Sequence, residues 1–393
     1  MVLLLFLTIY LYVSFFVVLK LEQKGFAVIA ALACFSRLIM CLAGLFIVLP
    51  FGGDDAQTFE RIAADWSQGS FAQVLATFDL SRSYVFSSVI AVFYWLLEVN
   101  IAIPVFINGI AGVLIFYFAM ILAGTVWPTS KNNLIFGLLV ALHPMLNVDS
   151  AITLRENLII LFLVMSAFSL VSYIKYRSLK HLFLYMLLAI FSAFFHGAIV
   201  IFIAGLPLYL IFFSGSFSYH SKVFVALAFS GCLFLFLFYA DLGKVEVMQE
   251  EGFSVETLAE VQLSRKDAAT VYLQGVVPDN VFDIVWQTPL RVVNFLFQPF
   301  PWRVTDPRYI MVFFDAILWV FIISILIRNI RHVSQNKAAL ALLVSAFVLV
   351  VVFSYGTGNF GTAIRHRTKF LVLFLVVVYP FLPNFSIRRS KNT

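Results

Sequence analysis

The sequence predicts an all-α polytopic membrane protein, a bundle of about eleven transmembrane helices that forms one integral domain over residues 1–393. Apolar residues make up 62% of the chain and charged residues only 12%, far from the composition of soluble proteins. Apolar runs recur from Met1 to Leu382, and a helix of about 20 such residues spans a bilayer. The runs lack the alternation of barrel strands, so helices are the expected spanning structure.

The predicted spans follow these runs in order. They lie near residues 2–19, 26–49, 101–124, 133–147, 154–174, 182–195, 197–213, 221–240, 308–327, 337–356 and 369–384. No small-residue cleavage site follows the first run, so we expect it to be retained as a span. The apolar segment 84–97 is only about four turns long, and we expect it to be re-entrant or interfacial. Two long segments, about 50–100 and 241–307, are expected to form outer loops.

Lys and Arg residues predict the orientation, because they concentrate in short cytoplasmic loops. With the N-terminus outside, eleven spans place all of these segments in the cytoplasm: Lys20–Lys24, the loop holding Lys131, Tyr176–His181, Lys222, Arg328–Lys337 and the tail from Arg388. All of the 20 carboxylates except Glu22 and Asp315 then fall on the outer side. The net charge of +6 fits contact with anionic membrane lipid, and no nucleic-acid partner is expected.

The first outer loop opens with an acidic pair. Gly52 and Gly53 precede Asp54 and Asp55, and either carboxylate can cap the helix that follows. Because the pair lies where the chain leaves the membrane, it could instead act as general base toward a hydroxyl of a lipid-borne substrate, or bind a metal ion. A divalent metal is not otherwise indicated, and no cofactor is required.

Three cations interrupt apolar runs. Arg155 opens a predicted span, where a cation opposes the helix dipole; it either binds an anion such as diphosphate or pairs with a neighbouring carboxylate. His196 lies between two spans, as a satisfied core residue or facing an outer pocket, where it could shuttle a proton or hold phosphate. Arg37 lies in the middle of a span and needs a partner or a wet cavity, which the sequence does not identify.

A second group of cations lies in the predicted outer loop Gly356–Arg367. Arg365, His366 and Arg367 could extend toward the interface from a span end, but positive residues are disfavoured on the outer side. We therefore expect them to bind a phosphorylated lipid headgroup. Secondary candidates for the same role are Arg82, Arg291 and Arg303. All three cysteines lie inside predicted spans, and no disulfide or metal pair is indicated: Cys34, Cys41 and Cys232.

Three stretches together resemble enzymes of bacterial surface-polysaccharide assembly. They are Gly53–Phe59, with its acidic pair; His143–Ile159, in which Arg155 opens a span; and Lys175–Gly197, with a basic turn followed by Phe195-His196-Gly197. Their order is similar to that of the EpsG/Wzy-like exopolysaccharide and O-antigen polymerases, which share features with GT-C glycosyltransferases. The predicted loop Gly356–Arg367 resembles the family's late arginine-bearing loop. Phe59 stands where that family commonly has Tyr, and the outer loop 241–307 does not align.

The resemblance implies a GT-C-like helix bundle and a glycosyltransferase of the bacterial cytoplasmic membrane whose active site faces the periplasm. It would transfer a glycan from polyprenyl diphosphate to a sugar hydroxyl of a lipid-linked acceptor, with a chain-length regulator or other assembly proteins as partners. Asp54 or Asp55 would be the base. The diphosphate would be held by Arg155, His196, Arg365 and Arg367. The alternatives are a GT-C transferase that adds one sugar from polyprenyl phosphate, a transporter of lipid-linked oligosaccharide or small solutes, and a structural subunit without chemistry.

Overall fold

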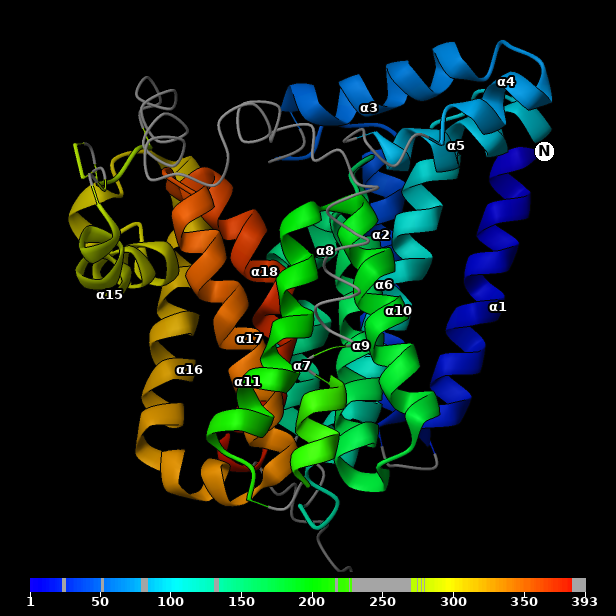
Figure 1. Ribbon diagram of the computed structural model, residues 1–393. Helices are drawn as coiled ribbons and strands as arrows, with labels where there is room; N and C mark the ends of the chain where they lie inside the picture. Colours follow the sequence, from blue (N-terminus) through cyan, green and yellow to red (C-terminus); the bar gives the residue numbers. More distant parts are fainter. Residues whose placement is uncertain are drawn as a thin grey trace, which may run out of the picture.

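The computed structural model is helical throughout the part of the chain that it describes, apart from connecting loops and one antiparallel β-bridge between Val271 and Asn359 (Figure 1). It describes residues 1–22, 26–50, 53–78, 84–130, 134–215, 218–225, 227, 270–273, 275–276, 278 and 280–383. Six of its helices are long and apolar enough to cross a membrane: α1 (Val2–Glu22), α2 (Ala27–Gly44), α6 (Ala102–Val126), α9 (Glu156–Tyr176), α16 (Ile310–Gln335) and α17 (Lys337–Gly356). The expectation of a multi-pass helical membrane protein is thereby confirmed, whereas the number of eleven spans stays a prediction.

Shorter helices complete the bundle. They are α7 (Leu134–Leu142), α8 (Pro144–Asp149), α10 (Leu179–Phe195), the 3-10 helix η1 (Gly197–Ala204), α11 (Gly205–Phe212) and α18 (Phe360–Val378). The predicted span 133–147 is broken because Pro144 cannot continue α7. His143 instead caps α8, since its Nδ1 accepts a hydrogen bond from the Leu146 N–H at 3.4 Å.

Contacts between side chains fix the direction of each helix. α1 and α6 run in the same direction, because Tyr10 contacts Phe106 and Phe16 contacts Tyr117. α9 begins beside the second turn of α6, and α10 runs back along α9. α16 and α18 run in the same direction. α17, which connects them in the chain, runs antiparallel to both.

The ends of three helices meet at one end of the bundle. Asn336, between α16 and α17, donates to the Val126 carbonyl at 2.8 Å, and the Trp127 indole donates to the Val376 carbonyl near the end of α18 at 3.0 Å. The basic residues at the ends of α1 and α9 and around the α16–α17 turn lie at this end. We call it the basic end.

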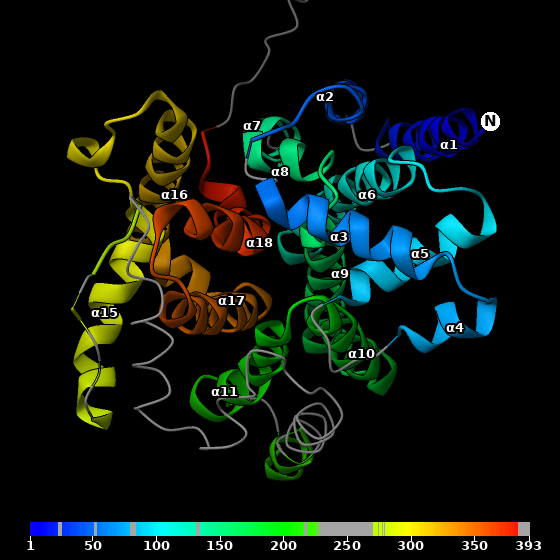
Figure 2. The same ribbon diagram turned by 90° about the horizontal axis from the view of Figure 1, so that it is seen from above.

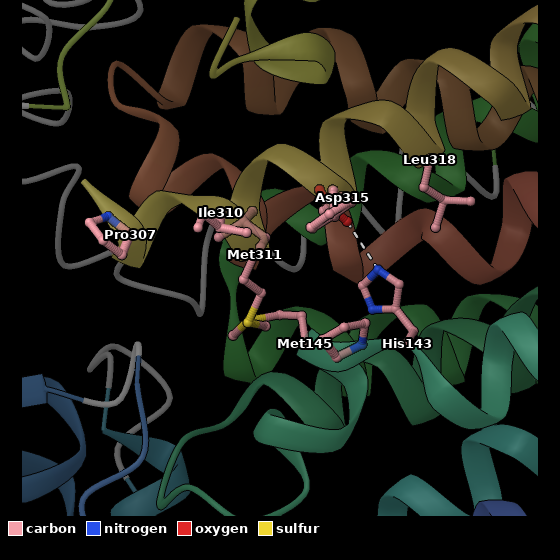
Figure 3. Close-up of a pocket in the computed structure, with 10 residues that line it drawn as sticks. His143, Met145, Pro307, Ile310, Met311, Asp315 and Leu318 are labelled. Carbon is pink, nitrogen blue, oxygen red and sulfur yellow. Dashed lines mark hydrogen bonds and ion pairs between the residues drawn. The ribbon is translucent and has the colours of Figure 1, made fainter. Parts of the chain in front are cut away.

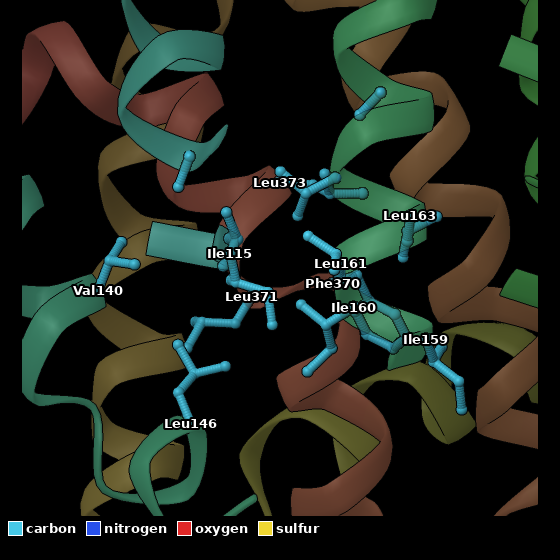
Figure 4. Close-up of a cluster of buried hydrophobic side chains, with 14 of the residues drawn as sticks. Ile115, Val140, Leu146, Ile159, Ile160, Leu161, Leu163, Phe370, Leu371 and Leu373 are labelled. Carbon is cyan, nitrogen blue, oxygen red and sulfur yellow. The ribbon is translucent and has the colours of Figure 1, made fainter. Parts of the chain in front are cut away.

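The apolar half of α18 is the centre of the bundle. Every residue from Phe370 to Val378 is buried, and α6, α7, α8, α9, α16 and α17 all contact this helix. Figure 4 shows Phe370, Leu371 and Leu373 of α18 among side chains of α6 and α9. Because these side chains are buried by neighbouring helices, this half of α18 is surrounded by protein rather than lipid.

The opposite end of the bundle carries the three helices of the segment that the sequence predicts to be the first outer loop: α3 (Gly53–Trp66), α4 (Phe71–Ala76) and α5 (Val85–Leu96). Figure 1 shows α3 lying across the bundle at a steep angle to the long helices, and Figure 2 shows it crossing above α9. α5 is 12 residues long, about 18 Å, which is too short to cross a bilayer core of about 30 Å by itself. Tyr84 contacts Phe59 of α3, and Phe93 contacts Phe6 at the start of α1.

Two segments that were predicted to be outer loops differ from the prediction. The segment Gly356–Arg367 is mostly helical and not a loop, because the Asn359 side chain accepts a hydrogen bond from the Thr362 N–H at 2.7 Å and caps α18 three residues after α17 ends. The predicted loop 241–307 also contains a helix, α15 (Val281–Phe297), which begins with a capping box formed by Asn280 and Asp283. Residues 241–269 lie outside the described part.

Candidate functional site

Arg365 joins three segments that are distant in the sequence. Its Nη1 donates to Asp55 Oδ2 of α3 at 2.9 Å, across 310 residues, and its Nη2 donates to Glu156 Oε1 at the start of α9 at 3.0 Å. The two carboxylates differ in exposure, since the side chain of Asp55 is 63% exposed and that of Glu156 only 4%. One guanidinium therefore has a buried partner and a partner that water can reach.

Lys369 lies on the same face of α18, one turn after Arg365. Its Nζ is 3.9 Å from Glu156 Oε1 and 5.5 Å from the centre of the Phe353 ring, and the side chain is wholly buried. Arg155 directly precedes Glu156 in the chain, and its guanidinium lies 5.5 Å from the ring centre of Phe59 on α3. We call Asp55, Arg155, Glu156, Arg365 and Lys369 the polar cluster.

Asp149, at the end of α8, borders the polar cluster. Its side chain is 1% exposed, and neither carboxylate oxygen accepts a hydrogen bond from the residues that the structure describes. Burial raises the pKa of this carboxyl well above its usual range, and the charge of Glu156 acts in the same direction, whereas Arg365 and Lys369 lower it. A carboxyl in such surroundings favours its protonated form.

Two histidines continue the cluster toward α10. The rings of His196 and His366 lie 5.4 Å apart, and both contact Phe353, the ring that also faces Lys369. His366 Nδ1 is 3.0 Å from Thr357 Oγ1. The structure therefore brings together five of the residues that the sequence singled out: Asp55, Arg155, His196, Arg365 and His366.

Arg367 does not join them. It is fully buried on a different side of α18, where it pairs with Asp315 of α16, and Asp315 also lies 3.0 Å from His143 Nε2. The Arg367 guanidinium donates to the carbonyls of Phe295, Leu296, Gln298 and Val312. It thus satisfies the carbonyls at the end of α15, which an ending helix leaves without partners. The role of Arg367 is therefore structural, and none of these hydrogen-bond partners belongs to the polar cluster.

The secondary candidates are also separate. Arg291 of α15 donates to the Val276 carbonyl and to Gln287, and it stacks on Tyr355. Burial lowers the pKa of Arg291, while the two neighbouring tyrosines raise it. Arg303 donates to the Val271 carbonyl at 2.5 Å. Arg82 lies outside the described residues, and Asp54 is described only as part of α3, without its side chain.

Arg37 has hydrogen-bond partners that no sequence pattern could predict. Its guanidinium donates to the carbonyls of Ala33, Val140 and Ala141 at 3.0–3.2 Å. The last two are carbonyls that α7 leaves open where Pro144 interrupts it. Of the two interpretations left open by the sequence, the structure favours the structural one.

The sequence analysis missed Lys369, and it considered Glu156 only as a neighbouring carboxylate that could pair with Arg155. The sequence does contain a signal for Lys369. If residues 360–369 are interpreted as a helix, Lys369 follows Arg365 at a spacing of four and lies on the same face. Among the described residues, no group of three or more His, Cys, Asp or Glu side chains is placed to hold a metal ion.

The polar cluster lies at the end of the bundle opposite the basic end, because α18 begins at the cluster and ends beside Trp127. Its chemistry is that of an anion-binding site with carboxylates close by. No family model, curated protein or solved structure matches the chain.

Proposed function

We propose that the protein is a membrane-embedded glycosyltransferase of surface-polysaccharide assembly. It transfers a glycan from polyprenyl diphosphate to a sugar hydroxyl of a lipid-linked acceptor on the outer side of the bacterial cytoplasmic membrane. The observation that carries the proposal is the position of Arg365 between exposed Asp55 and buried Glu156, at the end of the bundle away from the basic residues.

The diphosphate binds to Arg365 and Arg155. A guanidinium donates two parallel hydrogen bonds to phosphate oxygens, and these charge-assisted bonds are about twice as strong as neutral ones. Buried Glu156 keeps Arg365 in position, while the more exposed Asp55 exchanges with the phosphate. Binding of the donor thus releases the Asp55 carboxylate beside the reacting sugar.

Asp55 then acts as the general base, with Asp54 as the alternative on the same turn. The acceptor hydroxyl attacks the anomeric carbon and its proton passes to the carboxylate. The bond between that carbon and the diphosphate oxygen breaks, and its electron pair leaves with the diphosphate. Arg155 and Arg365 stabilise the charge that develops there, which is commonly the largest contribution to such catalysis.

His196 and His366 support the leaving group from the other side of Phe353. A protonated imidazole can donate a hydrogen bond to phosphate near neutral pH. The two histidine rings contact each other, and the amine of Lys369 lies beside the same Phe353 ring. This side of the polar cluster therefore holds several hydrogen-bond donors. The mechanism needs no metal ion, because cations of the chain neutralise the diphosphate.

A transporter is the second candidate, because one observation favours it. Discontinuous helices and buried charges are typical of transporters, and the chain has both at α7–α8, beside Arg37. Here, however, the guanidinium of Arg37 donates hydrogen bonds to the carbonyls that the helix break exposes. The break therefore has a structural reason that does not need a transported solute.

The test uses the purified protein in lipid nanodiscs with a lipid-linked repeat unit as donor and acceptor. We expect Asp55→Asn and Arg365→Ala each to lower turnover by about 10²-fold or more. Asp65→Asn is the matched control, since Asp65 is exposed near the far end of the same helix. If the first two variants fold and retain full turnover, the proposed site is wrong.

The products separate the enzyme candidates. A polymerase produces a ladder of chain lengths, whereas a transferase of single sugars from polyprenyl phosphate produces one fixed mass increase. A transporter leaves the glycan unchanged and moves it between the two sides of a sealed vesicle. In cells that lack the protein, we expect one lipid-linked repeat unit to accumulate.

A further inference from the structure

An apolar cavity of about 530 Å³ lies between α8 and α16, beside the buried helix α18. Figure 3 shows Met145 of α8 and Met311 of α16 facing each other across it, with Pro307 toward one end and Leu318 toward the other. The remaining lining residues are His143, Pro144, Ile310, Phe314, Asp315 and Ile364. The cavity is formed by three helices that are not adjacent in the sequence.

The two polar residues of the lining already have partners. His143 Nε2 lies 3.0 Å from Asp315 Oδ1, and the other oxygen of that carboxylate pairs with Arg367. His143 Nδ1 accepts a hydrogen bond from the Leu146 N–H. What the cavity presents to an occupant is therefore mainly the surface of aliphatic, aromatic and thioether side chains. Such cavities stay dry and take apolar ligands.

The mouth of the cavity faces the outside of the bundle. Phe314 is 62% exposed and Ile310 is 46% exposed, although both line the cavity. Both belong to α16, which is one of the helices apolar enough to cross a membrane. A ligand that enters beside these side chains comes from the hydrocarbon of the bilayer.

The inner wall of the cavity is adjacent to the polar cluster. Ile364, fully buried in that wall, directly precedes Arg365 on α18. Successive residues of a helix point about 100° apart. The apolar cavity and the cation of the cluster thus lie on neighbouring sides of a single turn.

We infer that this cavity binds the isoprenoid chain of the lipid-linked substrate, next to the phosphate-binding guanidinium of Arg365. The inference rests on the proposed function, because the cavity by itself accepts any long apolar chain. An isoprenoid phosphate matches both halves of the arrangement, a branched apolar chain in the cavity and an anion beside Ile364. The phosphate position at Arg365 favours this occupant over a neutral lipid.

The experiment uses geranylgeranyl diphosphate that carries a benzophenone at the end of its chain, with the full-length protein in nanodiscs. Photolabelled residues are mapped by mass spectrometry. We expect labelling at Met145, Met311 and Leu318. Labels confined to other surfaces of the bundle overturn the inference, and this result needs no enzymatic activity and no variant.

Two variants sharpen the result. Met311→Trp fills the cavity and is expected to lower labelling about tenfold. Ile317→Trp on the same helix is the control, because Ile317 is 46% exposed and does not line the cavity. Equal labelling of both variants, with thermal unfolding showing both to be folded, contradicts the inference.

Competition identifies the source of the chain. Unlabelled polyprenyl phosphate should abolish labelling in the cavity, whereas phosphatidylglycerol at the same concentration should not. Equal competition by phosphatidylglycerol assigns the cavity to bilayer phospholipid and overturns the inference. Cavity labelling in a protein that transfers no glycan would instead remove the proposed function while leaving the binding site in place.

Discussion

A substitution of Arg367 tests whether it has a structural role, in contrast to the phosphate-binding role of Arg365 two residues before it. The sequence grouped it with Arg365 as a phosphate ligand, but its guanidinium is fully buried and occupied by Asp315 and by four carbonyls. If this arrangement is structural, Arg367→Met should destabilise the fold. A ligand for phosphate should instead tolerate the change and lose only substrate binding.

The magnitude follows from what the variant leaves behind. Removing one partner of a buried ion pair strands the other charge in a medium of low dielectric, at a cost of about 3–5 kcal/mol. His143 continues to contact Asp315, which offsets part of this loss. Each carbonyl left without a donor adds about 1 kcal/mol. The four carbonyls alone account for about 4 kcal/mol, so we expect Arg367→Met to lower the free energy of unfolding by at least about 4 kcal/mol.

The assay is unfolding of the purified protein in detergent, followed by helical circular dichroism, together with a double variant. Asp315→Leu/Arg367→Met removes both charges, and replacing a buried pair by apolar residues is often neutral. We expect it to recover at least about half of the loss, the rest being the open carbonyls. A loss below about 1 kcal/mol in Arg367→Met, together with abolished turnover, would refute the structural role.

Three other predictions test the bundle. Arg37→Met should lower the free energy of unfolding by about 1–3 kcal/mol in the same assay, because the Val140 carbonyl loses its donor while Asn147 still donates to the Ala141 carbonyl; an unchanged unfolding midpoint would contradict a stabilising role of Arg37 at the end of α7. Gly205→Ala should destabilise by about 1–3 kcal/mol, since its Cβ would lie 2.3 Å from Ser345 Cα, whereas Gly124→Ala meets nothing within 4 Å and should be neutral. The raised pKa of Asp149 means that its contribution to stability is complete below about pH 4 and lost as the pH rises through the folded-state pKa. In thermal unfolding at several pH values, Asp149→Asn should show a smaller decline toward neutral pH, and a decline equal to that of the wild type would refute this.

The sequence predicted the fold class well because its signal is compositional. Long apolar runs require helices in a bilayer whatever their packing, and the six helices that can span carry that signal individually. Packing between runs has no such local signature. The break at Pro144 was missed because the apolar run continues across it. The hydrogen bonds that Arg37 and Asn147 donate to the carbonyls at the end of α7 explain how a buried break is tolerated.

The polar cluster was predicted in part. Asp55, Arg155, His196 and Arg365 could be selected because charged residues at the ends of apolar runs need a reason. The error came from interpreting Gly356–Arg367 as a loop, in which three neighbouring cations act together. In a helix, residues two apart face different directions, so Arg365 and Arg367 reach different partners. α15 was missed because an amphipathic helix has no long apolar run.

The polar first half of α18 explains how one short segment serves several purposes. Because α18 is surrounded by other helices, each of its successive side chains meets a different neighbour. Ile364 lines the apolar cavity, Arg365 reaches α3 and α9, His366 meets His196, and Arg367 ties α15 and α16 together. A substrate chain in the cavity and a phosphate on Arg365 would therefore contact consecutive residues of one rigid helix. Anchoring of this helix by Arg367 keeps that spacing fixed, so loss of Arg367 should impair transfer even though Arg367 contacts neither part of the substrate.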